Sequence, residues 1–295
     1  MSDTDIQLRL ASESIAGQRP YQEDAVLTEA LPDGRTLVAV ADGMGGHAAG
    51  EVASALALET LVQALKEGKE LQEAFRLANQ RVHEKAKEPG KQGMGTTLVA
   101  MVLDGDSYQV ANVGDSRGYR LSAGEIEQIT EDHSFVAEAV KRGESEEKMM
   151  ASQWKDALTR SIGNEPEVEA DIFGPFTLEP DSAVLLCSDG LYKTLSSSDL
   201  LALFLRSGGP RGASQSLVAE AFEKGSDDNI TVAVAELGEI PRDRPAGTMP
   251  LEWEPPDEGQ DAATSDSAGA SEDAPAPEPA GEEPKKKKKG WWPFG

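Results

Sequence analysis

The order of the apolar runs between residues 36 and 121 constrains the fold more than any other feature of this sequence. Four β-rich runs predict strands, at residues 36–41, 96–103, 107–113 and 118–121. Two runs with helical spacing predict amphipathic helices, at residues 50–67 and 71–87. Two helices therefore follow one another directly, whereas a doubly wound parallel sheet needs strands and helices in alternation. The order instead predicts antiparallel sheets covered by pairs of helices.

The residues between two of these runs predict a hairpin. Asp104, Gly105 and Asp106 supply turn chemistry between them. Later in the chain, strands are predicted at residues 183–187 and 230–236, and helices at 135–142, 198–205 and 213–224. A charged, irregular segment at residues 131–165 lies between two groups of strands, and we interpret it as an inserted flap.

The composition of the chain changes near residue 240. Ten of the 17 prolines follow that point, and residues 251–284 contain eleven Asp and Glu but no Lys or Arg. Such a segment cannot bury enough apolar area to offset the entropy of ordering it. We therefore predict a folded domain over residues 1–240, an acidic, Pro-rich disordered linker over 241–284, and a basic-aromatic motif over 285–295.

The overall charge and the cysteine content exclude several classes of protein. A formal charge of −25 repels phosphate backbones, so a nucleic-acid partner is not expected. The single cysteine, Cys187, excludes a disulfide within the chain and a zinc site built on cysteines. The N-terminus is polar, and no apolar run approaches the roughly 18 residues of a membrane span. We expect a cytoplasmic monomer.

Acidic residues recur in one context, at the edge of an apolar run and beside Gly, Ser or Asn. They are Glu23 and Asp24, Asp42, Asp115, Asp189 and Asp228. Converging carboxylates repel one another strongly unless a positive charge lies among them. Oxygen ligands without Cys favour Mg²⁺ or Mn²⁺ over zinc. A single Asp beside Gly is more often a turn residue, so it is the repetition that favours a metal site.

Seven motifs also carry a family resemblance. In chain order they are RPYQED, VADGMGGHAAGE, GTTLVA, NVGDSRGY, LTRSIG, LLCSDGLY and DDNITVAV. This set resembles the metal-dependent protein serine/threonine phosphatases of the PPM (type 2C) family, in particular its bacterial branch, over about residues 8–237. The resemblance implies an α+β fold, a four-layer α-β-β-α sandwich of two antiparallel sheets flanked by helix pairs. It places the metal ions, Mn²⁺ or Mg²⁺, in a cleft at one end.

The resemblance assigns ligands for a first ion by position. Asp42 resembles the carboxylate that bridges two metal ions, and the carbonyl of Gly43 resembles a backbone ligand. Asp189 and Asp228 resemble the remaining ligands of the first ion. Two such cations would generate a bridging hydroxide that attacks phosphorus in line, without a phospho-enzyme. Phosphoserine and phosphothreonine proteins are the implied substrates, and a cognate Ser/Thr kinase is the implied counterpart.

Further positions complete the implied site. Glu23 and Asp24 match the acidic pair that binds the second ion directly or through water. Asp115 resembles the ligand of a third, weaker ion shared with Asp189. Arg19 matches the arginine that holds the substrate phosphate, a role suited to its forked guanidinium.

The sequence departs from the family pattern at several positions. Gln22 stands where many members have Asn, and Met44 stands where eukaryotic relatives have His. Methionine cannot donate a proton, so the general acid is unassigned. His47, three residues further on, is a candidate for this acid or for orienting the following helix, and a metal-bound water is another candidate acid. The flap matches the family only at its ends, so substrate choice cannot be inferred from the resemblance.

Three other interpretations compete. Gly43, Gly45 and Ala48 resemble a dinucleotide fingerprint, but a helix follows where a second parallel strand is needed. Asp104 and Asp106 in MVLDGDSYQ imitate the motif of phosphatases with an aspartyl nucleophile, although a hairpin turn explains them better. An inactive phosphoprotein-binding module on the same fold would retain carboxylates that only cost stability.

The C-terminal motif KKKKKGWWPFG has interpretations of its own. Lysines attract anionic lipid, and Trp and Phe favour the membrane interface. The same residues suit a protein partner, or a contact with the acidic domain of this chain. We favour a peripheral membrane or protein contact through Lys285–Phe294 over a solvated end.

Overall fold

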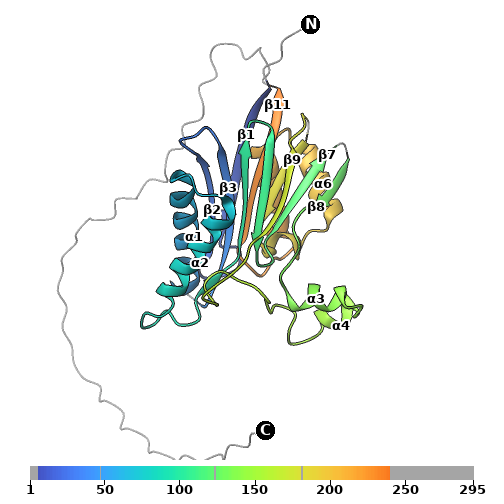
Figure 1. The fold of residues 1–295 in the computed structure, drawn as a ribbon. Helices are drawn as coiled ribbons and strands as arrows, with labels where there is room; N and C mark the ends of the chain where they lie inside the picture. The colour runs from blue at the N-terminus through green and yellow to red at the C-terminus, as the bar shows by residue number, and fades with distance from the viewer. Residues whose placement is uncertain (1–5, 47, 123, 181, 240–295) are drawn as a thin grey trace, which may run out of the picture. The chain divides into compact units, whose positions relative to one another are not determined.

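Two antiparallel sheets form the centre of the fold, which a computed structural model describes for residues 6–46, 48–122, 124–180 and 182–239 (Figure 1). The first sheet has the order β1 (Ile6–Ile15), β11 (Ile230–Glu239), β10 (Ser182–Cys187), β7 (Arg117–Ser122) and β8 (Glu125–Gln128). The second has the order β2 (Asp24–Ala30), β3 (Thr36–Met44), β5 (Leu98–Asp104), β6 (Ser107–Val113) and β9 (Asp171–Thr177), and β4 (Gly95–Thr96) pairs with the end of β3.

Helix pairs cover the outer faces of both sheets. The second sheet is covered by α1 (Ala48–Lys66) and α2 (Leu71–Lys85), and the first by α6 (Ser197–Arg206) and α7 (Pro210–Glu223). The short helix α5 (Asp189–Tyr192) follows β10, and the flap contains α3 (Phe135–Lys141) and α4 (Glu146–Met150). In Figure 1 the flap helices extend away from the sheets. The predicted four-layer α-β-β-α sandwich is therefore confirmed.

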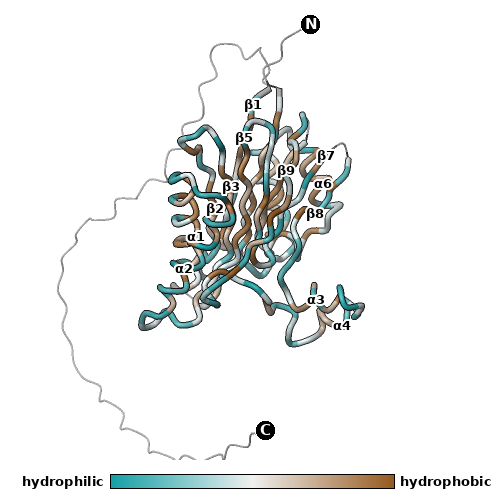
Figure 2. Tube along the Cα trace, viewed as in Figure 1, coloured by the Kyte–Doolittle hydropathy of each residue, from teal (hydrophilic) through white to brown (hydrophobic). Residues whose placement is uncertain are grey.

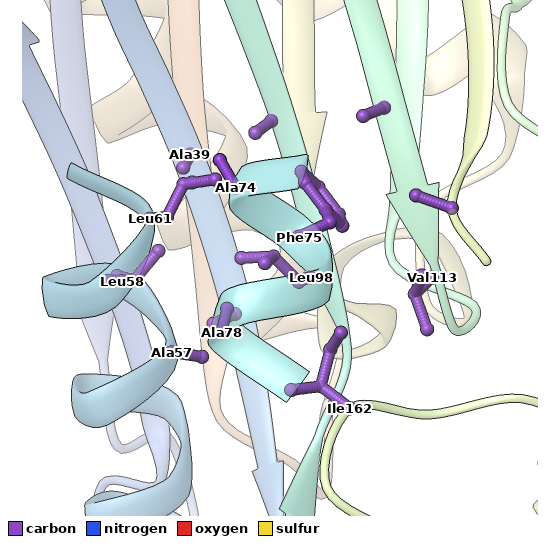
Figure 3. Packing of buried hydrophobic residues seen from close by; sticks show 14 of the residues in the cluster. Ala39, Ala57, Leu58, Leu61, Ala74, Phe75, Ala78, Leu98, Val113 and Ile162 are labelled. Carbon is purple, nitrogen blue, oxygen red and sulfur yellow. The ribbon is translucent and has the colours of Figure 1, made fainter. Parts of the chain in front are cut away.

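The central strand β3 shows why the sequence segments predicted as strands are continuously apolar. Val38 and Val40 belong to the layer between the sheets, whereas Leu37 and Ala39 belong to the layer under α1 and α2. Successive side chains of a strand point to opposite faces, so a strand buried on both faces has no polar alternation. Figure 3 shows the outer layer, with Ala39 beneath the two helices, and Figure 2 shows the apolar strands at the centre of the fold.

Several predicted elements are confirmed, and some boundaries differ. The hairpin is present, because Asp104 pairs with Ser107 and Gly105 has a φ of 63°. The predicted strand at 36–41 continues to Met44, because β4 pairs with its end. The strand predicted at 96–103 is divided into β4 and β5.

The predicted segments beyond residue 239 lie outside the described residues, so the linker and the terminal motif stay predictions. Within the part of the chain that the structure describes, no helix is both long and apolar enough to cross a membrane.

Candidate active site

The site is built on the paired ends of β2 and β3. Asp24 and Asp42 are direct partners in the register of these strands. The N–H of Gly43 donates to the carbonyl of Glu23 at 3.2 Å. A Cβ atom on Gly43 would lie only 2.2 Å from the carbonyl oxygen of Gly50 in α1. Glycine follows Asp42 because helix and strand approach too closely here for a side chain.

Hydrogen bonds connect Asp42 to the turn that carries Asp115. The N–H of Asp42 donates to Thr97 Oγ1 at 3.0 Å, and Thr97 N–H donates to the carbonyl of Asp42 at 2.9 Å. Thr97 Oγ1 is also 2.7 Å from Ser116 Oγ. The turn after β6 is therefore fixed against the end of β3, which brings Asp115 beside Asp42.

The loop before β11 and the start of α5 close the other side of the site. Ser188 Oγ donates to Asp24 Oδ2 at 2.7 Å. A Cβ atom on Gly190 would lie 2.0 Å from the carbonyl oxygen of Asn229, so α5 packs tightly against this loop. Asn229 Oδ1 accepts the N–H of Glu23 at 2.8 Å. Asp189 and Asp228 are thereby held near the ends of β2 and β3.

The electrostatics of these carboxyl groups show that they share one neighbourhood. Burial raises the pKa of Asp42 well above its usual range, and the charges of four neighbours add to the rise, namely Asp24, Asp189, Asp115 and Asp228. Burial, with the charges of Asp189 and Asp228, raises the pKa of Asp24 to about 7 against the hydrogen bonds that lower it. Burial and Asp189 likewise raise the pKa of Asp115 to about 7.

The residues present fit a hard divalent cation. Among the described residues, Asp24 Oδ1 and Asp189 Oδ1 are buried without a hydrogen-bond partner. A buried carboxylate oxygen without a partner is unfavourable, and a cation would satisfy it. The ligand atoms are all oxygens, which suits Mg²⁺ or Mn²⁺.

The carboxylate oxygens are not oriented toward one common point, as the ligands of a bound metal ion would be. Within the described ranges, no three His, Cys, Asp or Glu side chains are arranged to hold a metal ion. Asp189 instead contacts Lys193 at 2.7 Å, and Asp228 contacts Arg19 at 2.8 Å. Electrostatic coupling depends on where the groups lie, whereas coordination also depends on how their oxygens are turned. The carboxylates are therefore neighbours, and their roles as metal ligands stay predictions.

Arg19 lies at the edge of the carboxylate cluster. Its Nη2 donates to Asp228 Oδ2 at 2.8 Å and its Nε donates to the carbonyl of Asp227 at 2.7 Å. The side chain is 48% exposed, so solvent or substrate can reach it. His47 lies outside the described residues, and Met44 forms the end of β3.

Two residues of the site were missed by the sequence analysis. Lys193 lies four positions after Asp189, an i,i+4 spacing that could have indicated the contact. Asn229 gave no comparable signal, because its side chain contacts backbone groups of Ala16, Tyr21 and Glu23, more than 200 positions away. Long-range contacts of this kind become visible once the fold is known.

The rival motif around Asp104 lies away from the site. Thr36 pairs with Leu103 and Val40 pairs with Val99, so the hairpin follows the end of β5 that lies farthest from Asp42. Asp104 is exposed in this turn. The antiparallel order of the second sheet likewise leaves the glycines after β3 outside a dinucleotide-binding βαβ unit.

A cavity of about 550 Å³ adjoins the site and extends under the flap. Asp115, Tyr192 and Lys193 line it on the site side, and Val136 and Met150 line it on the flap side. Substrate that entered this cavity would contact both the carboxylate cluster and the flap.

Comparisons with known proteins agree with this architecture. The family model of protein phosphatase 2C matches residues 13–221. The serine/threonine phosphatase stp of Listeria welshimeri is 37% identical over 227 residues, which cover 72% of this chain and 89% of that protein. The structure of the S. agalactiae serine/threonine phosphatase is similar at a TM-score of 0.73 and 32% identity, covering 78% of this chain and 99% of that chain.

A further solved structure bears on the metal site. It is the catalytic domain of the serine/threonine protein phosphatase PstP in complex with two manganese ions. It is similar at a TM-score of 0.66 and 33% identity, covering 79% of this chain and 99% of that chain. The family resemblance read from the motifs is confirmed by these similarities. The chain belongs to the protein phosphatase 2C family.

Proposed function

We propose that this protein is a metal-dependent phosphatase that hydrolyses phosphoserine and phosphothreonine in proteins. The observation that carries the proposal is the convergence of four carboxylates on the buried Asp42, whose pKa is raised well above its usual range by burial and further by these charges. Such a cluster is unfavourable without positive charge, so its presence favours a cation-dependent activity. The serine/threonine phosphatases similar to this chain support the substrate class.

The chain's own residues would hold two Mn²⁺ or Mg²⁺ ions. Asp42, Asp189, Asp228 and the carbonyl of Gly43 would hold the first, with Asp42 shared between both. Glu23 and Asp24 would hold the second, directly or through water. When bound, the ions would supply a bridging hydroxide for in-line attack and neutralise charge on the phosphate. The two manganese ions of the similar PstP domain support this number.

Arg19 is proposed to orient the substrate phosphate. Its guanidinium is half-exposed and adjoins Asp228, so it is positioned beside the ions that the carboxylates would hold. A forked guanidinium can donate to two phosphate oxygens at once and stabilise charge that develops on them. Because the nucleophile is proposed to come from water, no protein side chain has to become phosphorylated.

The leaving alcohol of the substrate needs a proton. Met44, after Gly43 in β3, carries no ionisable group. His47 therefore stays a candidate acid on sequence grounds alone.

The cavity beneath the flap carries both signs of charge, including Glu146 and Lys155, and fits a polypeptide segment around the phosphorylated residue. A Ser/Thr kinase that adds this phosphate is the expected counterpart.

A phosphate-release assay on a phosphothreonine peptide tests the proposal. Wild-type protein should release phosphate in the presence of Mn²⁺, and the release should stop when EDTA is added. Asp42→Asn should lower kcat by about 100-fold or more, because it removes a charge on which both ions depend. Asp104→Asn is the matched control, since Asp104 is exposed in the hairpin turn away from the site, and it should keep wild-type activity.

Other outcomes would support the rival functions. Activity that survives EDTA and disappears in Asp104→Asn would identify an aspartyl nucleophile instead. Binding of the peptide without hydrolysis at any Mn²⁺ concentration would identify a phosphoprotein-binding module.

A further inference from the structure

Lys193 places a positive charge within the carboxylate cluster. Its Nζ lies 2.7 Å from Asp189 Oδ2 and 3.1 Å from Asp156 Oδ1. Asp189 begins α5 and its side chain is 13% exposed, whereas Asp156 lies on the flap and is 59% exposed. The ammonium group therefore connects a carboxylate of the site to a carboxylate of the flap.

The charge of the same ammonium group also acts on Asp115. Lys193 and Asp115 both line the cavity beneath the flap, together with Tyr192. Burial and the charge of Asp189 raise the pKa of Asp115, and the charge of Lys193 opposes that rise. Lys193 thus lies among three carboxylates, and two of them are the residues expected to share a third metal ion, Asp115 and Asp189.

The two oxygens of Asp189 have different surroundings. Oδ2 accepts from Lys193, while Oδ1 is buried without a hydrogen-bond partner among the described residues. Oδ1 can therefore face the first divalent ion while Oδ2 stays with the lysine. A third divalent ion bound by Asp115 and Asp189 would lie near the ammonium group of Lys193, which is 2.7 Å from Asp189 Oδ2. The two positive charges would repel each other. The positive charge of Lys193 therefore disfavours a third ion beside Asp189.

We propose that the ammonium group of Lys193 takes the place of a third metal ion, so that the chain binds two divalent ions and supplies the third positive charge itself. This inference rests on the proposed function, which provides the two ions. A side-chain cation cannot dissociate from the chain, so this positive charge is present beside Asp189 at any metal concentration. Lys193 would act as a positioning residue that orients Asp189 and anchors the flap.

Counting bound Mn²⁺ by equilibrium dialysis of the full chain tests the inference without measuring activity. Wild-type protein should bind two ions, in a titration continued well beyond saturation. Lys193→Ala should bind a third, weaker ion, because it vacates the space between Asp115 and Asp189. Lys155→Ala is the matched control, since this neighbouring flap lysine is 56% exposed and contacts Asp156 at 3.7 Å, and it should still bind two.

Two variants of Asp115 assign the extra ion. Adding Asp115→Asn to Lys193→Ala should return the count to two, whereas a count that stays at three would place the extra ion elsewhere and overturn the inference. Asp115→Asn alone should leave the wild-type count at two, and this comparison stands even where Lys193→Ala fails to fold.

The remaining outcomes separate the two proposals. A wild-type count of three, or a folded Lys193→Ala that binds two, overturns the role of Lys193 and leaves the phosphatase proposal intact. A wild-type protein that binds no Mn²⁺ overturns both.

Discussion

His133 is buried and holds the turn that carries Asp115. Its Nδ1 accepts the N–H of Gly114 at 3.0 Å, so Nε2 is assigned the proton that it donates to Asp171 Oδ2 at 3.1 Å. The N–H of His133 also donates to the carbonyl of Gly114 at 3.0 Å. Burial lowers the pKa of His133, even though Asp171 favours the charged form. A second proton would remove the bond at Nδ1, so the turn depends on the neutral ring.

We expect His133 to contribute stability that is lost on acidification. A histidine whose pKa is lowered by folding stabilises fully above its unfolded value of about 6.5, and this contribution declines as the pH falls below it. The difference in unfolding free energy between wild type and His133→Gln should therefore shrink from pH 7.5 to pH 5.5. Urea unfolding at each pH measures it. A difference that is constant with pH would contradict this role.

At the scale of elements, the junction of β3 with α1 determines the geometry of the site. An added Cβ at Gly43 would meet the carbonyl oxygens of Gly50 at 2.2 Å and Glu23 at 2.6 Å. Both are backbone atoms of neighbouring elements, so relief requires that helix and strand move apart. The same movement would displace Asp42, which precedes the glycine in β3.

We predict that Gly43→Ala destabilises the protein by about 1–3 kcal/mol, the usual cost of overpacking. Gly238→Ala in β11 is the matched control, because its Cβ would meet the flexible side chain of Arg9 at 3.0 Å. The control should change the unfolding free energy by less than about 0.5 kcal/mol. Chemical denaturation measures both, and equal effects would show that the close approach at Gly43 is unimportant.

For the whole molecule, the carboxylate cluster links stability to pH and to metal. Burial raises the pKa of Asp24 and of Asp115 to about 7, whereas in the unfolded chain both ionise near 3.9. The folded, metal-free protein therefore retains protons that the unfolded chain releases, and its stability falls as the pH rises through this window. A bound cation reverses the effect, because it favours the ionised carboxylates.

We expect protein treated with EDTA to have a Tm at least about 4 °C higher at pH 5.5 than at pH 8. Mn²⁺ should raise the Tm more at pH 8 than at pH 5.5. Differential scanning calorimetry of both forms across this range measures the two trends. A metal-free Tm that rises with pH would mean that the carboxylates do not interact as described.

The sequence predicted the centre of the fold better than its edges. Strands β3, β5, β6, β7, β10 and β11 were expected, whereas β1, β2, β8 and β9 were not. The four that were missed are the edge strands of the two sheets. An edge strand is partly exposed, so it lacks the continuous apolar run by which a buried strand is recognised.

Part of the candidate site was likewise predicted from the sequence, and part was not. The carboxylates were found because each repeats one local context, an acid beside a small residue at the end of an apolar run. The contacts that orient them were not found, because Asn229 acts on Glu23 from a distant segment, and the contact of Lys193 with Asp189 is one of many i,i+4 spacings in the chain. The role of Asn229 follows from the pairing of distant segments, which a local pattern does not record.

The position of β11 has a consequence for biosynthesis. This strand lies between β1 and β10, and Asp228 and Asn229 immediately precede it. During translation, β1 leaves the ribosome before the other strands, and it cannot pair with β11 until the end of the domain has been synthesised. The mutually repelling carboxylates are likewise brought together by the final segment. A nascent chain therefore stays without its active site until β11 has emerged.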